Sequence, residues 1–219
     1  TCGRVSEAIQ QLSSLAEVYY SLADLENARK TYTEALRLAQ QSKIDRSLRI
    51  QILHRMADID LQSLDWRQAL RIFEQIRTLQ PDDEQARSSL VLINFRLGQE
   101  SAGVEELDNA VTYLANSAQP ERAIRFLETL IQENPEMVPV RRRLAEGYRQ
   151  VGRLEEAIRE FDMVGDLLLQ AGDRQGAIHA VESILAMDPE NREDYQDALR
   201  QLRGWSSLGL NQKADGCHR

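Results

Sequence analysis

The sequence predicts an all-α fold, an α-solenoid of about eleven antiparallel helices, from two observations. The first is a recurring triplet: a small residue, a bulky apolar residue four positions later, and another apolar residue three beyond, which together form one stripe of a helix. It occurs at Ala28–Tyr32–Ala35, Ala69–Phe73–Ile76, Gly103–Leu107–Ala110, Ala123–Leu127–Leu130, Ala157–Phe161–Val164 and Ala177–Val181–Ile184. The second is composition, because five prolines and eleven glycines in 219 residues leave most of the chain free to be helical. A stripe that recurs at fixed intervals indicates a repeat array.

The boundaries of the expected helices follow from proline and glycine. The first four helices are expected over 6–23, 25–42, 44–62 and 66–79, the last of them ended by Pro81. Gly98 separates 84–97 from 100–115, and Pro120 suits the first turn of 120–133. The remaining helices are expected over 138–151, 154–169, 174–187 and 192–203, between Pro135, Gly152, Gly172, Pro189 and Gly204. Connections of a few residues make neighbouring helices antiparallel.

The steps between the small residues of the triplets are unequal, and they predict a duplication. The steps are 41 residues from Ala28 to Ala69 and 34 from Ala69 to Gly103, but only 20 from Gly103 to Ala123. A step of 20 fits one helix and a turn, so the helices at 100–115 and 154–169 each serve two pairs. The segments 84–136 and 138–190 then form a three-helix unit repeated at an offset of 54 residues. This offset aligns Arg87 with Arg141, Leu90 with Leu144, Gly98 with Gly152, Leu114 with Leu168, Ala123–Ile124 with Ala177–Ile178, and Pro135–Glu136 with Pro189–Glu190.

The organisation expected from these patterns has six parts. A lead-in over 1–8 precedes two helix hairpins over 9–83, and the two three-helix units follow over 84–136 and 138–190. A helix over 191–203 is interpreted as a solvating cap, because it has one apolar face and one charged face. Residues 204–219 fit no repeat and are expected to form a flexible tail.

The chain resembles the tetratricopeptide repeat family in the residues of these stripes. The resemblance is carried by Leu12, Leu15, Ala16, Tyr19, Ala28, Tyr32 and Ala35, by Leu53, Met56, Ala57, Ala69, Phe73 and Pro81, and by Leu144, Ala145, Tyr148, Gly152, Ala157 and Phe161. It implies a right-handed superhelix of helix hairpins with a concave inner face that binds a protein or peptide. Asp60 and Asn94 stand where the family usually has an aromatic residue, and Gly103 replaces the usual alanine. These departures indicate a divergent natural array.

Composition and missing motifs exclude several classes of function. A net charge of −8 argues against a nucleic-acid partner, which needs a basic surface. No apolar run approaches the roughly 20 residues that span a membrane. Two cysteines are too few for a disulfide framework, which favours a reducing, cytoplasmic location. No catalytic or phosphate-binding motif is present, so we expect neither an enzyme nor a cofactor. Cys217 and His218 are too few ligands for a metal site.

The partner-binding residues are expected on the inner face of the first helix of each repeat. Transferring the family's inward positions by stripe gives Tyr20, His54, Arg55, Phe95, Arg96, Arg142, Arg143 and Arg149 as candidates. Arginines in the groove of an acidic protein favour a partner that carries carboxylates. The alternatives are that the run Arg141–Arg143 forms salt bridges with nearby acids, and that His54 is an ordinary surface histidine.

The function expected from this pattern is a non-enzymatic scaffold or adaptor that holds a protein or peptide. Because the chain starts at Thr1 rather than Met, a second interpretation makes it a fragment, the regulatory region of a larger sensor or transcription regulator. A third makes it a module that self-associates through helix faces exposed at the ends of the array.

Overall fold

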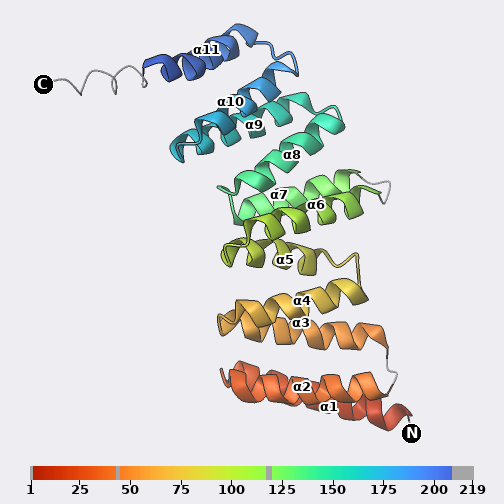
Figure 1. Cartoon of the computed structure of the whole chain (residues 1–219). Coiled ribbons are helices and arrows are strands. Elements are labelled where there is room, and N and C mark those ends of the chain that lie inside the picture. Colours follow the sequence, from red (N-terminus) through yellow and green to blue (C-terminus); the bar gives the residue numbers. More distant parts are fainter. Residues whose placement is uncertain (1, 43–44, 117–119, 209–219) are drawn as a thin grey trace, which may run out of the picture. The chain divides into compact units, whose positions relative to one another are not determined.

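The computed structural model describes residues 2–42, 45–116 and 120–208, and within these ranges it contains eleven helices and no strand (Figure 1). The helices are α1 (Cys2–Ser21), α2 (Leu25–Gln41), α3 (Arg46–Gln62), α4 (Trp66–Leu79), α5 (Glu84–Arg96), α6 (Glu100–Asn116), α7 (Pro120–Glu133), α8 (Val138–Gln150), α9 (Leu154–Gln170), α10 (Arg174–Leu185) and α11 (Arg192–Leu208). The predicted all-α repeat fold is confirmed. The handedness of the superhelix stays a prediction.

The helix bounds differ most from the prediction at the two ends of the chain. Helix α1 already begins at Cys2, so it contains residues expected to form a lead-in, because no proline interrupts this stretch. Helix α11 continues through Gly204 to Leu208, so residues 204–208, expected in the tail, are helical, and residues 209–219 lie outside the described residues. Helix α10 ends at Leu185, two residues early, because Asp188 turns the chain with a φ of 55°.

The chain forms two compact units, residues 1–113 and 114–219, and the boundary between them falls in α6. In the first unit α1 packs on α2, α2 on α3, α3 on α4 and α4 on α5. In the second unit the same sequential packing joins α7 to α8, α8 to α9, α9 to α10 and α10 to α11. Each hairpin buries its second face against the next one, as expected of a repeat array.

The triplets that predicted the fold form its core. Their small residues are buried in all six cases, and so are their bulky and third residues, with one exception. The exception is Val181, which is only half-buried. Small residues let the helix axes approach, and the bulky residue one turn later fills the gap beside them.

One turn geometry closes five of the helices. A residue with positive φ follows each helix: Ala23, Leu64, Gly98, Gly152 and Gly172. Its N–H bonds to the carbonyl three residues back, and the next N–H bonds to the carbonyl five residues before it, as in Gly98 to Phe95 (3.0 Å) and Gln99 to Asn94 (2.9 Å). This pattern satisfies the carbonyl groups that a helix end leaves open. The repeated turn explains why connections are short and neighbours antiparallel.

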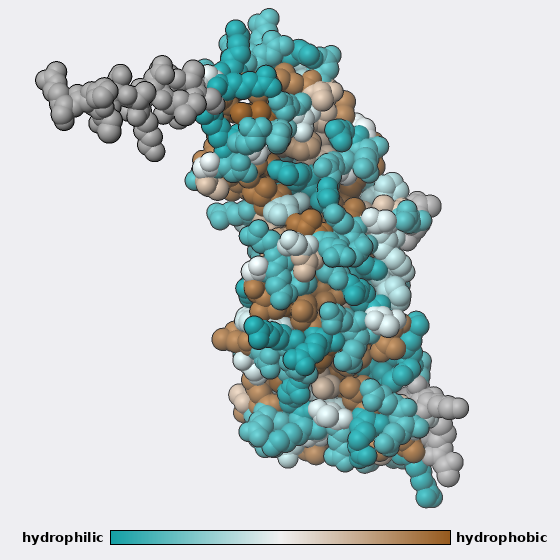
Figure 2. Space-filling view, in the orientation of Figure 1, coloured by the Kyte–Doolittle hydropathy of each residue, from teal (hydrophilic) through white to brown (hydrophobic). Residues whose placement is uncertain are grey.

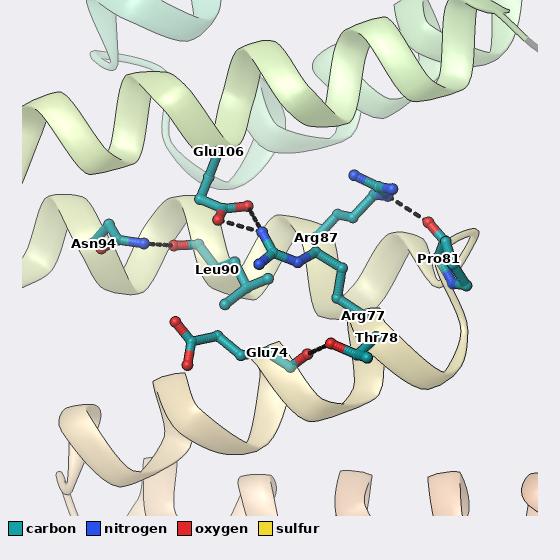
Figure 3. A network of polar contacts seen from close by, with 8 residues as sticks. All are labelled: Glu74, Arg77, Thr78, Pro81, Arg87, Leu90, Asn94 and Glu106. Carbon is teal, nitrogen blue, oxygen red and sulfur yellow. Dashed lines mark hydrogen bonds and ion pairs between the residues drawn. The ribbon is translucent and has the colours of Figure 1, made fainter.

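A polar network stabilises the packing of α4, α5 and α6 (Figure 3). Arg77 of α4 pairs with both carboxylate oxygens of Glu106 in α6. The buried Arg87 of α5 donates from Nε to the carbonyl of Pro81 at 2.7 Å, and its guanidinium lies 4.2 Å from the ring centroid of Tyr113. Burial lowers the pKa of Arg87. Asn94, which stands at a position where an aromatic residue was expected, donates instead to the carbonyl of Leu90 one turn earlier, at 2.8 Å.

The second unit contains an arginine in the matching place. Arg141 of α8 is buried and donates from Nε to the carbonyl of Pro135 at 2.5 Å, as Arg87 does to Pro81. Its Nη1 bonds to Glu160 of α9 at 2.6 Å. Helices α8, α9 and α10 begin 54 residues after α5, α6 and α7. These correspondences support the predicted duplication, which stays an inference from sequence and bounds.

The glycine at 103 has a packing reason. A Cβ atom built on Gly103 would lie 2.8 Å from Cε2 and 2.9 Å from Cδ2 of Phe95. The Phe95 ring therefore lies directly on the backbone of α6, at a distance that no alanine permits. By contrast, a Cβ on Gly147 of α8 would meet only Ile124, at an ordinary contact of 3.4 Å.

Candidate functional site

The first candidate surface, which we name the α1–α3 face, is made of Ser13, Glu17, Tyr20, Arg55 and Gln62. These residues come from α1 and α3, and Tyr20 and Arg55 are among the candidates predicted from the stripes. A cavity of about 350 Å³ opens on this face. It is lined by Ser13, Ser14, Glu17, Tyr32, Leu48, Gln51, Ile52 and Arg55. The structure therefore brings residues of three helices, α1, α2 and α3, to one concavity.

Most polar groups of the α1–α3 face are paired with one another. Glu17 accepts a hydrogen bond from the Tyr32 hydroxyl at 2.7 Å, and it lies 3.4 Å from Nη2 of Arg55. Gln62 donates to the Tyr20 hydroxyl. Burial, with the neighbouring Glu17 carboxylate, raises the pKa of Tyr32, so this hydroxyl stays a donor. Ser13 is different, because its Oγ is buried and has no hydrogen-bond partner among the described residues.

The α1–α3 face is not a basic surface. Arg55 contacts both Glu17 and, at 4.0 Å, Asp58 of its own helix. Burial raises the pKa of Asp58, although Arg55 opposes this shift. Because two carboxylates surround one guanidinium, the face offers no excess positive charge to an acidic partner.

His54 has a structural place. Its Nε2 lies 2.8 Å from Oδ2 of Asp83, and its ring meets the Phe73 ring edge-on with the centroids 6.3 Å apart. Asp83 also caps the start of α5 by accepting from the N–H of Ala86 at 2.8 Å. His54 is therefore half-buried and joins α3 to the first turn of α5. It is not an ordinary surface histidine, and its partner-binding role stays a prediction.

Phe95 and Arg96 also make contacts within the fold. The Phe95 ring is half-buried against Gly103 of α6, so helix packing already uses much of the predicted apolar anchor. Arg96 is exposed, and its guanidinium lies 4.5 Å from the ring centroid of Trp66, at the start of α4. Sequence reasoning missed Trp66 because stripe position places residues on a helix but does not show which other helix they reach.

The second candidate surface, which we name the α8 arginine stripe, is made of Arg142, Glu146 and Arg149. Positions i, i+4 and i+7 place the three on one face of α8. Arg142 and Arg149 are exposed, and neither has an ion pair within the described residues. The neighbouring residues of the run are paired: Arg141 with Glu160, and Arg143 with Glu146 at 2.7 Å. Salt bridges thus account for two of the three arginines and leave Arg142.

The described residues hold no group of three or more His, Cys, Asp or Glu side chains placed to bind a metal ion. Cys217 and His218 lie outside the described residues. Of the helices described, none combines the length and the apolar character needed to cross a membrane.

Two sequence profiles described as tetratricopeptide repeat match the chain, one over residues 8–82 and the other over 114–167. Together they cover more than half of its length. No curated protein matches the chain.

Solved structures with the same class of fold share little sequence with the chain. They include a MamA protein (14% identity, 98% of both chains covered, TM-score 0.44). Another is a tetratricopeptide repeat protein from Parabacteroides merdae (15% identity, 89% of this chain and 84% of the other covered, TM-score 0.41). A third contains nearly identical tetratricopeptide-like repeats of a putative kinesin light chain from Podosopora anserina (16% identity, 92% of this chain and 96% of the other covered, TM-score 0.42). The profile matches, the buried triplets and the repeated hairpin turn agree, and the chain belongs to the tetratricopeptide repeat family.

Proposed function

We propose that the chain is a non-enzymatic scaffold or adaptor that holds an extended segment of another protein on its inner face. Tetratricopeptide repeats are in general scaffolds for protein–protein interaction. The proposal goes further and assigns one contact surface to each unit, each considered by itself: the α1–α3 face in the first unit and the α8 arginine stripe in the second.

The observation that carries the proposal is the unsatisfied Ser13 hydroxyl at the cavity of the α1–α3 face. A buried polar atom without a partner costs free energy, and a backbone group of a bound peptide would supply the missing hydrogen bond. Glu17, Arg55 and Gln51 around it offer both donors and acceptors. We therefore expect this face to bind a polar segment of mixed charge.

The α8 arginine stripe supports an acidic element in the partner. Arg142 and Arg149 are exposed side chains with two turns of helix between them, so a segment with carboxylates at matching intervals would pair with both. Charge at such a surface acts mainly on the rate of association and on the choice of partner. Arg142 also stands near the start of α8, where a positive charge opposes the helix dipole and does not stabilise the helix.

Reversing the two exposed charges with Arg142→Glu/Arg149→Glu is expected to weaken partner binding at least tenfold while the fold is kept. The first step is to select ligands for the intact chain from a library of displayed peptides, and the second is to measure their affinity for the variant by fluorescence anisotropy. The difference in affinity between the unaltered chain and the variant is expected to become smaller as salt is added, because salt screens exposed charge pairs.

The matched control is Arg125→Glu/Arg159→Glu, which makes the same change in net charge at two exposed arginines of α7 and α9. This control is expected to bind as the unaltered chain does. An equal loss of peptide affinity in both variants would mean that net charge, and not the α8 arginine stripe, causes the effect. Unchanged affinity in the α8 variant would show that the stripe is not part of the binding surface.

A second candidate function, self-association, is favoured by the outer face of α1. Leu15 and Val18 of α1 are 45% and 52% exposed, and Leu22, directly after the end of the helix, is 71% exposed. Leu15, Val18 and Leu22 are spaced at intervals of three and four residues. We expect light scattering to show a mass that rises with concentration, and Leu15→Glu/Leu22→Glu to return it to that of one chain. A constant monomer mass up to high concentration would exclude this candidate.

A further inference from the structure

The second unit contains a cavity between α9, α10 and α11 that the proposed function does not use. Its volume is about 680 Å³, which lies in the range of cavities that bind small molecules. Apolar side chains from all three helices make up most of its lining, including Phe161, Leu169, Val181, Ile184 and Leu202. Hydrophobic (brown) atoms are visible below α11 in Figure 2.

The cavity lies under α11, where the residues of α9, α10 and α11 that face the space are small. Gly165, Ala177 and Ala198 face it from α9, α10 and α11. Helix α11 is fixed at two places: the Tyr195 hydroxyl donates to Asp162 of α9 at 2.8 Å, and Arg203 pairs with Glu182 of α10 at 2.5 Å. With its position set by these contacts, α11 does not fill the space. This is why Val181, alone among the triplet residues, is only half-buried.

Arg174, the arginine in the cavity lining, has two guanidinium nitrogens without a hydrogen-bond partner among the described residues. They are Nε and Nη2, and both are buried. Arg174 as a whole is half-buried, but these two buried nitrogens lack acceptors, and an anion in the cavity would supply them. Arg174 is also the first residue of α10, where the helix dipole disfavours a cation; the Asp173 carboxylate before it caps this helix by accepting from the N–H of Gly176 at 2.8 Å.

The other charged groups that line the cavity do not neutralise Arg174. Asp162 is occupied by the Tyr195 hydroxyl, and burial raises its pKa. Asp162 lies eight residues before the end of α9, which is about 12 Å along the helix axis. Arg174 lies beyond that end, directly after the α9–α10 turn. Asp166 is exposed at the rim, and no ion pair joins it to Arg174. The cavity is thus polarised, with its positive group at the end near the α9–α10 turn.

We propose that this cavity binds a free carboxylic acid with a single unbranched apolar chain. The carboxylate would accept hydrogen bonds from Nε and Nη2 of Arg174, and the chain would lie among Phe161, Val181 and Ile184. A peptide fits the lining less well, because each buried amide would need a partner that an apolar wall does not provide. This site is separate from the two surfaces assigned above, so either proposal can fail without the other.

The test compares three probes with the same ten-carbon chain, decanoate, decanol and decylamine, by isothermal titration calorimetry with the full chain below their micelle concentrations. Decanoate is expected to bind about 10- to 100-fold more tightly than decanol, as hydrogen bonds to charged groups allow. The Arg174→Gln variant is expected to bind decanoate with no higher affinity than it binds decanol. Arg125→Gln, an exposed arginine of α7 in the same unit, is the matched control and should change nothing.

Two further measurements separate a ligand site from a structural role. Val181→Phe fills the cavity and is expected to abolish binding of decanoate and decanol with an unchanged circular dichroism spectrum. Without ligand, Arg174→Gln is expected to have an equal or higher Tm, because it removes two buried nitrogens that lack acceptors. A lower Tm with undiminished decanoate binding would overturn the proposal, as would decylamine binding as tightly as decanoate, or a peptide with an apolar C-terminus binding more tightly than the free acid.

Discussion

Replacing Arg29 by methionine is expected to lower the free energy of unfolding by about 3 kcal/mol, the lower end of the cost of breaking a buried ion pair, because Arg29 itself is 32% exposed. The side chain of Asp60 is only 2% exposed, and both of its oxygens accept from Arg29, at 2.5 Å from Nε and 3.0 Å from Nη2. The pair joins α2 to α3. Without Arg29, the carboxylate has to be buried unpaired or drawn out to solvent, and either breaks the packing. Urea unfolding followed by circular dichroism would measure the loss.

The double variant Arg29→Met/Asp60→Leu provides the control. It removes both charges and puts apolar volume in their place, so we expect most of the stability to return. Asp60 stands where the family usually has an apolar aromatic residue, which makes the site suited to a hydrophobic side chain. If the double variant were as unstable as Arg29→Met alone, the cost would come from lost packing of the arginine stem and not from the stranded carboxylate.

The second large effect is expected at Phe73, where Phe73→Ala should cost about 3–5 kcal/mol. Phe73 is 0% exposed, packs beside Ala69 of its own stripe and carries the His54 ring on its edge. Its removal would leave an apolar void between α3 and α4. It would also remove the ring on which His54 packs, and so weaken the contact of His54 with Asp83 at the start of α5. Urea unfolding would again report the difference, as a lower midpoint.

Phe161→Ala is the matched comparison, because Phe161 holds the same position in the triplet of α9. Phe161 is 4% exposed and already borders the cavity under α11, so its side chain has fewer neighbours to lose. We expect a smaller loss of stability there than at Phe73, since the cost of truncation grows with the contacts and void volume at the site. A larger loss at Phe161 would contradict the account of that cavity as a pre-existing space.

The features predicted well from sequence are those that depend on residues near one another in the chain. The triplets specify which face of each helix is buried, and proline and glycine specify where helices stop, so most bounds agree within two residues. The acidic residue before several helices acts in the same local way, as Asp83 does by capping α5. Local rules of this kind need no knowledge of the tertiary structure.

The candidate binding residues were harder to predict because their environment depends on distant partners. His54 and Asp83 are 29 residues apart, and Arg29 and Asp60 are 31 apart. Stripe position predicts that Phe95 lies on an inner face, but only the structure shows that its ring packs on Gly103. The partner-binding role of the predicted residues stays a prediction, to be tested by the charge reversals on α8.

The sequence also could not separate two opposite consequences of a small residue. At Ala28 and Ala69 a small side chain brings two helices together, and both residues are fully buried. At Ala177, also buried, and at Ala198, the small side chains instead border the cavity, because α11 is held in place elsewhere, by Tyr195 and Arg203. The residue is alanine in both cases, and the position of the neighbouring helix decides whether the alanine allows close packing or borders a cavity.

The bonds from Arg87 to the carbonyl of Pro81 and from Arg141 to the carbonyl of Pro135 bear on how such a chain can change in length. In each case the arginine that fixes a connection belongs to the helix that follows it. A tandem insertion or loss of one whole segment, from one such proline to the next, would therefore carry the connection together with the group that shapes it. Growth by complete segments would disturb no existing turn, whereas an insertion between Pro81 and Arg87, or between Pro135 and Arg141, would separate a proline from its arginine.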